Sequence, residues 1–170
     1  MDIEITFNVL DSDVQSDIRT LADRTSASGL KFFLENVADP FLQSRVRQRF
    51  ASEGDDAVGP WLPLSPATEA IRQNKGYSGA HPINIRTSDM YDYLTSSRAD
   101  VSTTAASSTL TFPPAGANTL LEEKIRTAQM GKRYPATPAR PVLGLSMTDV
   151  TVITHDLAEY MMKDLMGTVI

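Results

Sequence analysis

The chain has 170 residues with 41% hydrophobic content, which suits one domain with a real core. Its formal net charge of −5 argues against nucleic-acid binding by the molecule as a whole. The absence of cysteine excludes disulfides, thiolate zinc sites and cysteine nucleophiles, and no apolar run is long enough to cross a membrane.

Residues 2–9 alternate between polar and apolar side chains, which predicts a half-buried strand. Its apolar face would hold Ile3, Ile5, Phe7 and Val9. Helical spacing follows, from a capping Ser12 to about Arg24, and the small residues around Gly29 are expected to interrupt it.

A second helical pattern begins near residue 30. Asp39 and Pro40 have the residue types of an N-cap and a first helical position, so we expect a helix to restart there. Its inward face would hold Leu42, Val46 and Phe50. Its outward face would hold Arg45, Arg47, Gln48 and Arg49.

Proline and glycine then predict three extended loops, around residues 54–66, 74–86 and 131–146. Trp61 lies inside the first loop and is expected to pin it to the core, with an interface anchor as the alternative. A short helix is expected from the Ser65 cap, and another is expected after Ser88 or Asp89.

Residues 98–112 alternate and predict a hairpin, and Asn118 begins a helix that should end at Gly131. The expected class is α+β. A small, mostly antiparallel sheet, made of the N-terminal strand and the hairpin, would be packed by several helices in a single domain spanning residues 1–170.

The segment 135–146 contains three prolines, which fix φ and remove backbone donors. It is predicted to be a rigid extended arm that displays Arg140 and suits contact with a neighbouring protomer. Ser146 and Asp149 form a capping box for a C-terminal amphipathic helix. The apolar face of that helix would hold Val150, Ile153, Leu157, Tyr160, Met161 and Leu165.

Nothing in the sequence indicates catalysis, a cofactor or a metal site. Neither His81 nor His155 has the neighbours of a common metal motif, and the adjacent acidic pairs at 55–56 and 122–123 do not form a carboxylate dyad. Basic residues at 45–49 and 124–133 are interpreted as solvated helix faces, with contact to a partner subunit or DNA as the alternative.

Four stretches carry a family resemblance: Arg49-Phe50 followed by 60–68, then 87–94, 125–131 and 138–146. Together they resemble the virion morphogenesis, or tail completion, family of Mu-like and P2-like tailed phages. Members of that family act as tail terminator or neck proteins, and the proline-arginine-proline segment at 138–146 is the most specific part of the match.

The resemblance implies a structural virion protein, made in the host cytoplasm, that is neither an enzyme nor a membrane protein. Copies would form a ring, with six as the expected number, at the head-proximal end of the tail. The ring would end the tail tube, meet neck proteins and let DNA pass without sequence-specific binding. The residues expected at its assembly interface are Trp61, Arg133, Tyr134, Arg140, Pro141 and Leu143.

Two other functions stay open. The chain could be a stopper or adaptor elsewhere in the neck, or a protein-binding module outside any virus. Because the arm is expected to be displayed, Arg140→Ala is predicted to impair assembly while leaving the melting temperature of the subunit within a few degrees.

Overall fold

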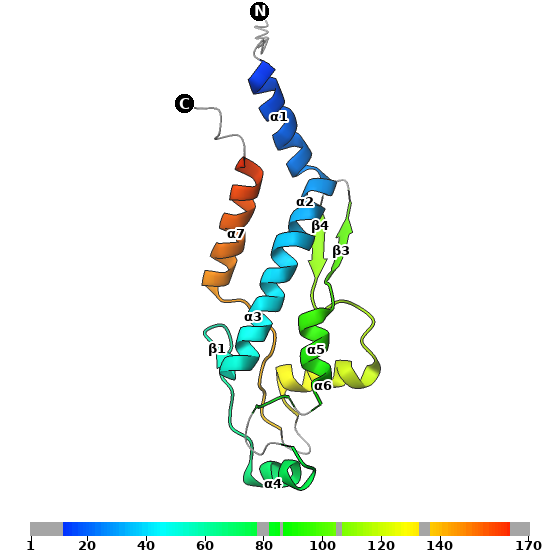
Figure 1. Cartoon of the computed structure of the whole chain (residues 1–170), viewed down its shortest axis with the longest axis vertical. Helices are drawn as coiled ribbons and strands as arrows, with labels where there is room; N and C mark the ends of the chain where they lie inside the picture. The colour runs from blue at the N-terminus through cyan, green and yellow to red at the C-terminus, as the bar shows by residue number, and fades with distance from the viewer. Residues whose placement is uncertain (1–11, 78–81, 86, 105–106, 133–136, 164–170) are drawn as a thin grey trace, which may run out of the picture.

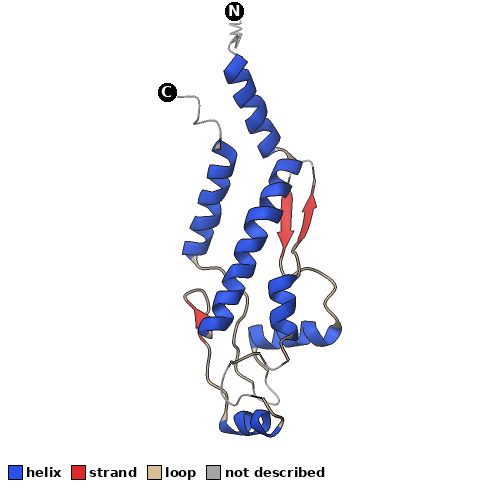
Figure 2. Cartoon of the chain, in the orientation of Figure 1, coloured by secondary structure: helices blue, strands red, loops and turns tan. Residues whose placement is uncertain are grey.

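The computed structural model describes residues 12–77, 82–85, 87–104, 107–132 and 137–163. The fold is α+β, with about 59% of the described residues in helices and 10% in strands, which confirms the predicted class (Figures 1 and 2). Its elements in chain order are α1 (Ser12–Thr25), α2 (Ala27–Phe33), η1 (Leu34–Ala38), α3 (Asp39–Ser52), β1 (Gly54–Asp55), β2 (Gly59–Pro60), α4 (Pro66–Asn74), α5 (Asp89–Ser96), β3 (Asp100–Thr103), β4 (Ser108–Thr111), α6 (Thr119–Met130) and α7 (Met147–Met162).

Helices α1, α2 and α3 follow one another along the long axis of the molecule (Figure 1). The predicted interruption between α1 and α2 is a single residue, Ser26, whose side chain accepts a hydrogen bond from the backbone N–H of Gly29. A Cβ on Gly29 would lie 2.3 Å from the backbone oxygen of Asp23. The close junction therefore requires glycine at this position.

Helix α3 begins at Asp39 with Pro40 in its first turn, as predicted, but Asp39 is not an N-cap, because the helix runs on from α2 through the π-helical turn η1 into α3. The backbone N–H of Asp39 donates to Leu34 O, five residues back. This wider turn places Pro40, which has no N–H, within a continuous helix. The buried Asp39 carboxylate instead accepts hydrogen bonds from Gln43 Nε2 and from the backbone N–H of Ala99.

The predicted hairpin is confirmed. Strands β3 and β4 pair antiparallel, with Val101 opposite Leu110 and Thr103 opposite Ser108, and the hairpin packs beside α2. Strands β1 and β2 form a second pair of two residues each. The predicted strand at residues 2–9 lies outside the described part of the chain.

The main core lies at the lower half of the molecule in Figure 1, where α3, α5 and α6 meet the extended loops. Phe50 is 2% exposed and contacts two other rings edge-on, Trp61 at 5.3 Å and Tyr91 at 5.3 Å between centroids. The core residues are Val46, Phe50, Trp61, Ile83, Met90, Leu94, Leu121, Ile125, Ala128 and Val142.

Arg49 is also part of this interior, at 1% exposure, so its predicted outward position is wrong. Its Nε and Nη2 lie 2.9 and 2.7 Å from Asp55 Oδ2. Its Nη1 donates to Val142 O at 2.9 Å and its Nη2 to Gly144 O at 3.0 Å. The planar guanidinium thus satisfies one carboxylate and two carbonyls that have no strand partner.

We expect Arg49→Met to lower the free energy of unfolding by about 3–5 kcal/mol, because the buried Asp55 carboxylate loses its ion pair. The matched control is Arg126→Met, an exposed arginine on α6 whose loss should change stability by about 0.5 kcal/mol or less. Urea titration of both variants measures the difference. Equal stability of the two variants would contradict the structural role of Arg49.

Candidate assembly surface

The proline-containing segment that follows α6 lies inward, not outward. Arg140 is 6% exposed, and its Nε and Nη2 donate to Leu62 O at 2.6 Å and Pro63 O at 2.9 Å. Burial lowers the pKa of the Arg140 guanidinium. The prediction that Arg140 is displayed is wrong, because the carbonyls of Leu62 and Pro63 have no sheet partner and take this side chain as their donor.

Trp61 is 6% exposed and donates from Nε1 to Pro141 O at 2.8 Å, so its predicted role as a core pin is confirmed. Pro141 and Leu143 are half-buried, and their predicted role at an assembly interface stays a prediction. Arg133 and Tyr134 lie outside the described residues.

Gln129, at the end of α6, holds the same segment and was not singled out from sequence. Its Oε1 accepts hydrogen bonds from the backbone N–H of Val142 at 2.9 Å and of Leu143 at 3.0 Å, while its Nε2 donates to Leu143 O at 2.7 Å. The side chain amide therefore replaces a strand partner for this stretch. The available signal was its place just before Gly131, the residue that ends the helix.

The capping box at the start of α7 is confirmed, and its carboxylate also anchors the helix to α3. Asp149 is 4% exposed; its Oδ2 accepts from Ser146, and its Oδ1 lies 2.7 Å from Arg45 Nε. Arg45 also contacts Asp56 at 2.8 Å. Burial alone would lower the pKa of Arg45, but the Asp56 hydrogen bond and the nearby carboxylates outweigh it and raise that pKa.

At its other end, α7 rests on α1 and α2 through Tyr160. The phenol hydroxyl donates to Gly29 O at 2.9 Å, and the ring lies 5.6 Å from that of Phe33 between centroids. The Arg24 guanidinium stands 5.7 Å from the centroid of the same ring, in cation–π geometry, and also donates to Lys163 O.

Between these two anchors, the apolar residues of α7 are covered only in part. Asp149 is the only buried residue of α7, and the apolar side chains of this helix are half-buried or exposed. Helices α1, α2 and α7 lie in the upper half of Figure 1, and we use "rod surface" for their exposed large apolar side chains. They are Ile18, Leu21, Phe32, Met147, Val150, Val152 and Met162.

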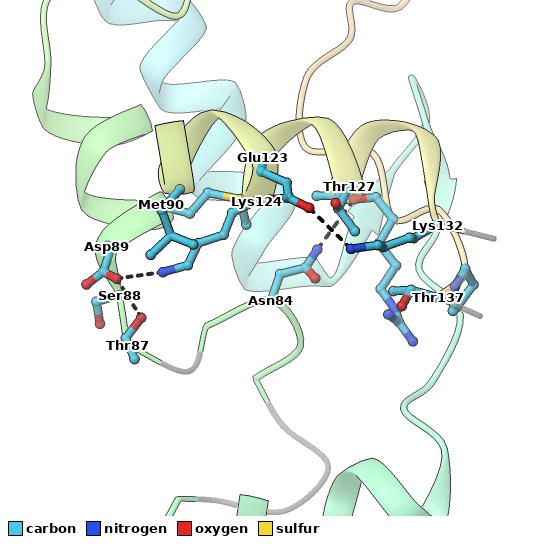
Figure 3. A pocket seen from close by; sticks show the side chains of 14 residues that line it. Asn84, Thr87, Ser88, Asp89, Met90, Glu123, Lys124, Thr127, Lys132 and Thr137 are labelled. Carbon is cyan, nitrogen blue, oxygen red and sulfur yellow. Dashed lines mark hydrogen bonds and ion pairs between the residues drawn. The ribbon is translucent and has the colours of Figure 1, made fainter. Parts of the chain in front are cut away.

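A pocket of about 640 Å³ lies between α5, α6 and residues 137–140, and Figure 3 shows its lining. Its two lysines are paired with carboxylates, Lys124 with Asp89 at 2.7 Å and Lys132 with Glu123 at 3.2 Å. The hydrogen bond from Lys124 lowers the pKa of Asp89, and Thr87 contributes a second one. This pairing leaves neither lysine unopposed for an anionic ligand.

The basic residues at 45–49 do not form the one solvated helix face that the sequence had indicated. Arg45 and Arg49 are turned to carboxylates of their own chain, and Arg47 donates to Thr95 O at 2.6 Å. Of the basic residues at 124–133, Lys124 and Lys132 are paired as described above, and Arg126 is exposed.

The structure also corrects the expectation that no Asp/Glu cluster accompanies His155. Its Nδ1 lies 4.0 Å from Asp156 and its Nε2 lies 3.7 Å from Glu159. All three side chains are more than one-third exposed on a single helix, a common arrangement of surface charge. His81 lies outside the described residues.

In the comparisons with known proteins, no family model, curated protein or solved structure matches this chain. Among the described residues, no helix is both long and apolar enough to span a membrane. Function therefore has to be argued from the geometry above and from the sequence resemblance.

The structure reverses the expected effect of Arg140→Ala. We now expect the substitution to lower subunit stability by about 1.5–3 kcal/mol, because two buried carbonyls lose a charged donor. For a chain of this length that corresponds to a fall of roughly 3–12 °C in melting temperature. Differential scanning calorimetry measures it, and a melt unchanged from the parent protein would contradict the buried contacts.

Asp149→Asn should loosen α7 from α3 while leaving the core intact, since the ion pair to Arg45 is lost. Backbone amide exchange in α7 should accelerate by about tenfold, the equivalent of about 1.4 kcal/mol. Glu159→Gln removes the same charge from an exposed position of α7 and serves as the control. Equal exchange rates in the two variants would show that Asp149 does not anchor the helix.

Proposed function

We propose that this protein is a structural subunit that assembles through its rod surface with copies of itself. The observation that carries the proposal is the exposure of several large apolar side chains on α7. Met147 is 80% exposed, Met162 is 46% exposed and Val150 is 43% exposed, while the only buried residue of α7 is an aspartate.

Exposed apolar side chains gathered on neighbouring helices are typical of a surface that a partner covers. On α1, Ile18 adds a further side chain with 55% exposure, and on α2 Phe32 adds one with 56%. Methionine is common at such contacts because its unbranched, polarizable side chain adapts to a partner surface.

The place of assembly comes from the sequence resemblance to phage tail completion proteins. We propose a closed ring at the head-proximal end of a tail, where it ends the tube and meets the neck. Cyclic symmetry repeats one head-to-tail contact around the ring. The net charge of −5 favours a channel through which DNA passes without adhering.

Two charged substitutions on the rod surface should weaken assembly without unfolding the subunit. We expect the double variant Met147→Glu and Met162→Glu to shift native mass spectra and light-scattering profiles from the assembled form to the monomer. The melting temperature of the monomer should change little, because exposed substitutions alter stability by about 0.5 kcal/mol or less.

The charge-matched control is Gln73→Glu with Thr119→Glu, which alters exposed polar positions of α4 and α6, outside the rod surface. The control should assemble like the parent protein. A parent protein that stays monomeric at all concentrations and does not bind tail tubes contradicts the proposal. Cryo-electron microscopy of the particle separates a terminator, seated on the tube, from a stopper or adaptor seated nearer the capsid.

A further inference from the structure

We propose that residues 2–9 of one copy add as a third strand along β4 of a neighbouring copy, so that subunits are joined by strand exchange. This inference rests on the proposed self-assembly and names one of its contacts. It has three parts: an open sheet edge, an apolar groove beside that edge, and a segment of this chain whose side chains alternate with the matching period.

The open edge belongs to the β3–β4 hairpin. Each strand has four residues, and among the described residues no other strand pairs with either of them. A two-stranded antiparallel sheet is marginally stable by itself, and its edges present unpaired N–H and C=O groups to an incoming strand. The hairpin is thus a template for β-augmentation.

The groove lies where β4 approaches α3 and the extended residues 143–145, and it has a volume of about 350 Å³. Leu110 and Phe112 are two residues apart, so they point to the same side of the hairpin and form one wall. Leu143 and Leu145 form part of the opposite wall. The two arginines in the lining, Arg45 and Arg49, are already paired with carboxylates of their own chain, so the groove favours apolar side chains.

Residues 2–9 have the pattern that such a site requires. Apolar side chains at positions 3, 5, 7 and 9 would enter the groove, and the polar residues between them would face solvent. Backbone hydrogen bonds to β4 would supply the pairing, and the alternate side chains would fix the register.

The strand has to come from a second copy, because the chain's own N-terminal segment is too short. From Ser12 to Leu42 the helices cover 30 residues along one axis, which is about 45 Å at the helical rise (Figure 1). Residues 2–11, fully extended, span at most about 36 Å. A segment of that length does not reach from Ser12 to the part of the groove beside Leu42, which points to a second copy as its source.

The absence of cysteine allows a direct test in the full chain. Single-cysteine copies at each position from 3 to 9 are mixed, one at a time, with a second copy that carries Leu110→Cys or, on the opposite wall, Leu145→Cys. A disulfide requires Cα atoms about 4.4–6.8 Å apart, so only side chains that enter the groove should be cross-linked.

We expect intermolecular disulfide dimers whose yield alternates along the segment, with odd positions exceeding even ones by roughly fivefold or more because successive side chains point to opposite faces. Asn8→Cys is the matched control for Phe7→Cys. Flat yields along the segment, or an absence of dimers with both groove partners in assembled protein, would overturn the inference.

Carrying Phe7→Cys and Leu110→Cys in one chain separates exchange from folding back. A disulfide within single monomers at high dilution would refute exchange between copies. Deleting residues 2–9 should weaken assembly at least as strongly as the rod-surface double variant does. If the deleted protein assembles normally, the strand inference fails while the proposed function stands; a parent chain that never assembles defeats the proposed function itself.

Discussion

The packing of the lower half of the molecule depends on the contacts of the buried Arg49 guanidinium. It connects α3, the Asp55 turn and the carbonyls of Val142 and Gly144, three parts of the chain that share no sheet. Because residues 137–146 are held in this way, Trp61 Nε1 can donate to Pro141 O and Gln129 Nε2 can donate to Leu143 O. The charge is tolerated in the interior because a carboxylate opposes it and carbonyls accept its remaining protons.

The same solution recurs wherever an extended loop enters the core. Arg140 serves the carbonyls of Leu62 and Pro63, and Arg72 serves those of Pro82 and Ile85. Proline-rich loops cannot form regular ladders, yet their buried carbonyls still need donors. Arginine supplies several donors in one plane, so a few side chains replace the missing sheet.

The two halves of the molecule differ in how many of their side chains are buried. The lower half encloses a core around Phe50 and its neighbours, whereas Phe33 and Asp149 are the only buried residues among those described in α1, α2 and α7. The core of the lower half therefore supplies most of the stability of the subunit. The side chains of α1, α2 and α7 that this chain leaves uncovered are where a partner would bind. In the proposed ring, the lower half would keep the subunit folded while the rod surface and the open hairpin provide contacts between copies.

Local signals in the sequence determined the elements: the Ser65, Asn118 and Ser146 caps, the helix end at Gly131 and the hairpin at 98–112 all lie where short-range sterics and hydrogen bonding predict them. Only the tertiary structure decided where the charges lie. Arg49 and Arg140 look like surface residues in a helical or proline-rich pattern, because their partners are carbonyls 77 to 95 positions away that no local period reveals. The continuous helix through Pro40 was likewise settled by the burial of Asp39 against Ala99, a contact between distant segments that outweighed the local preference for a cap.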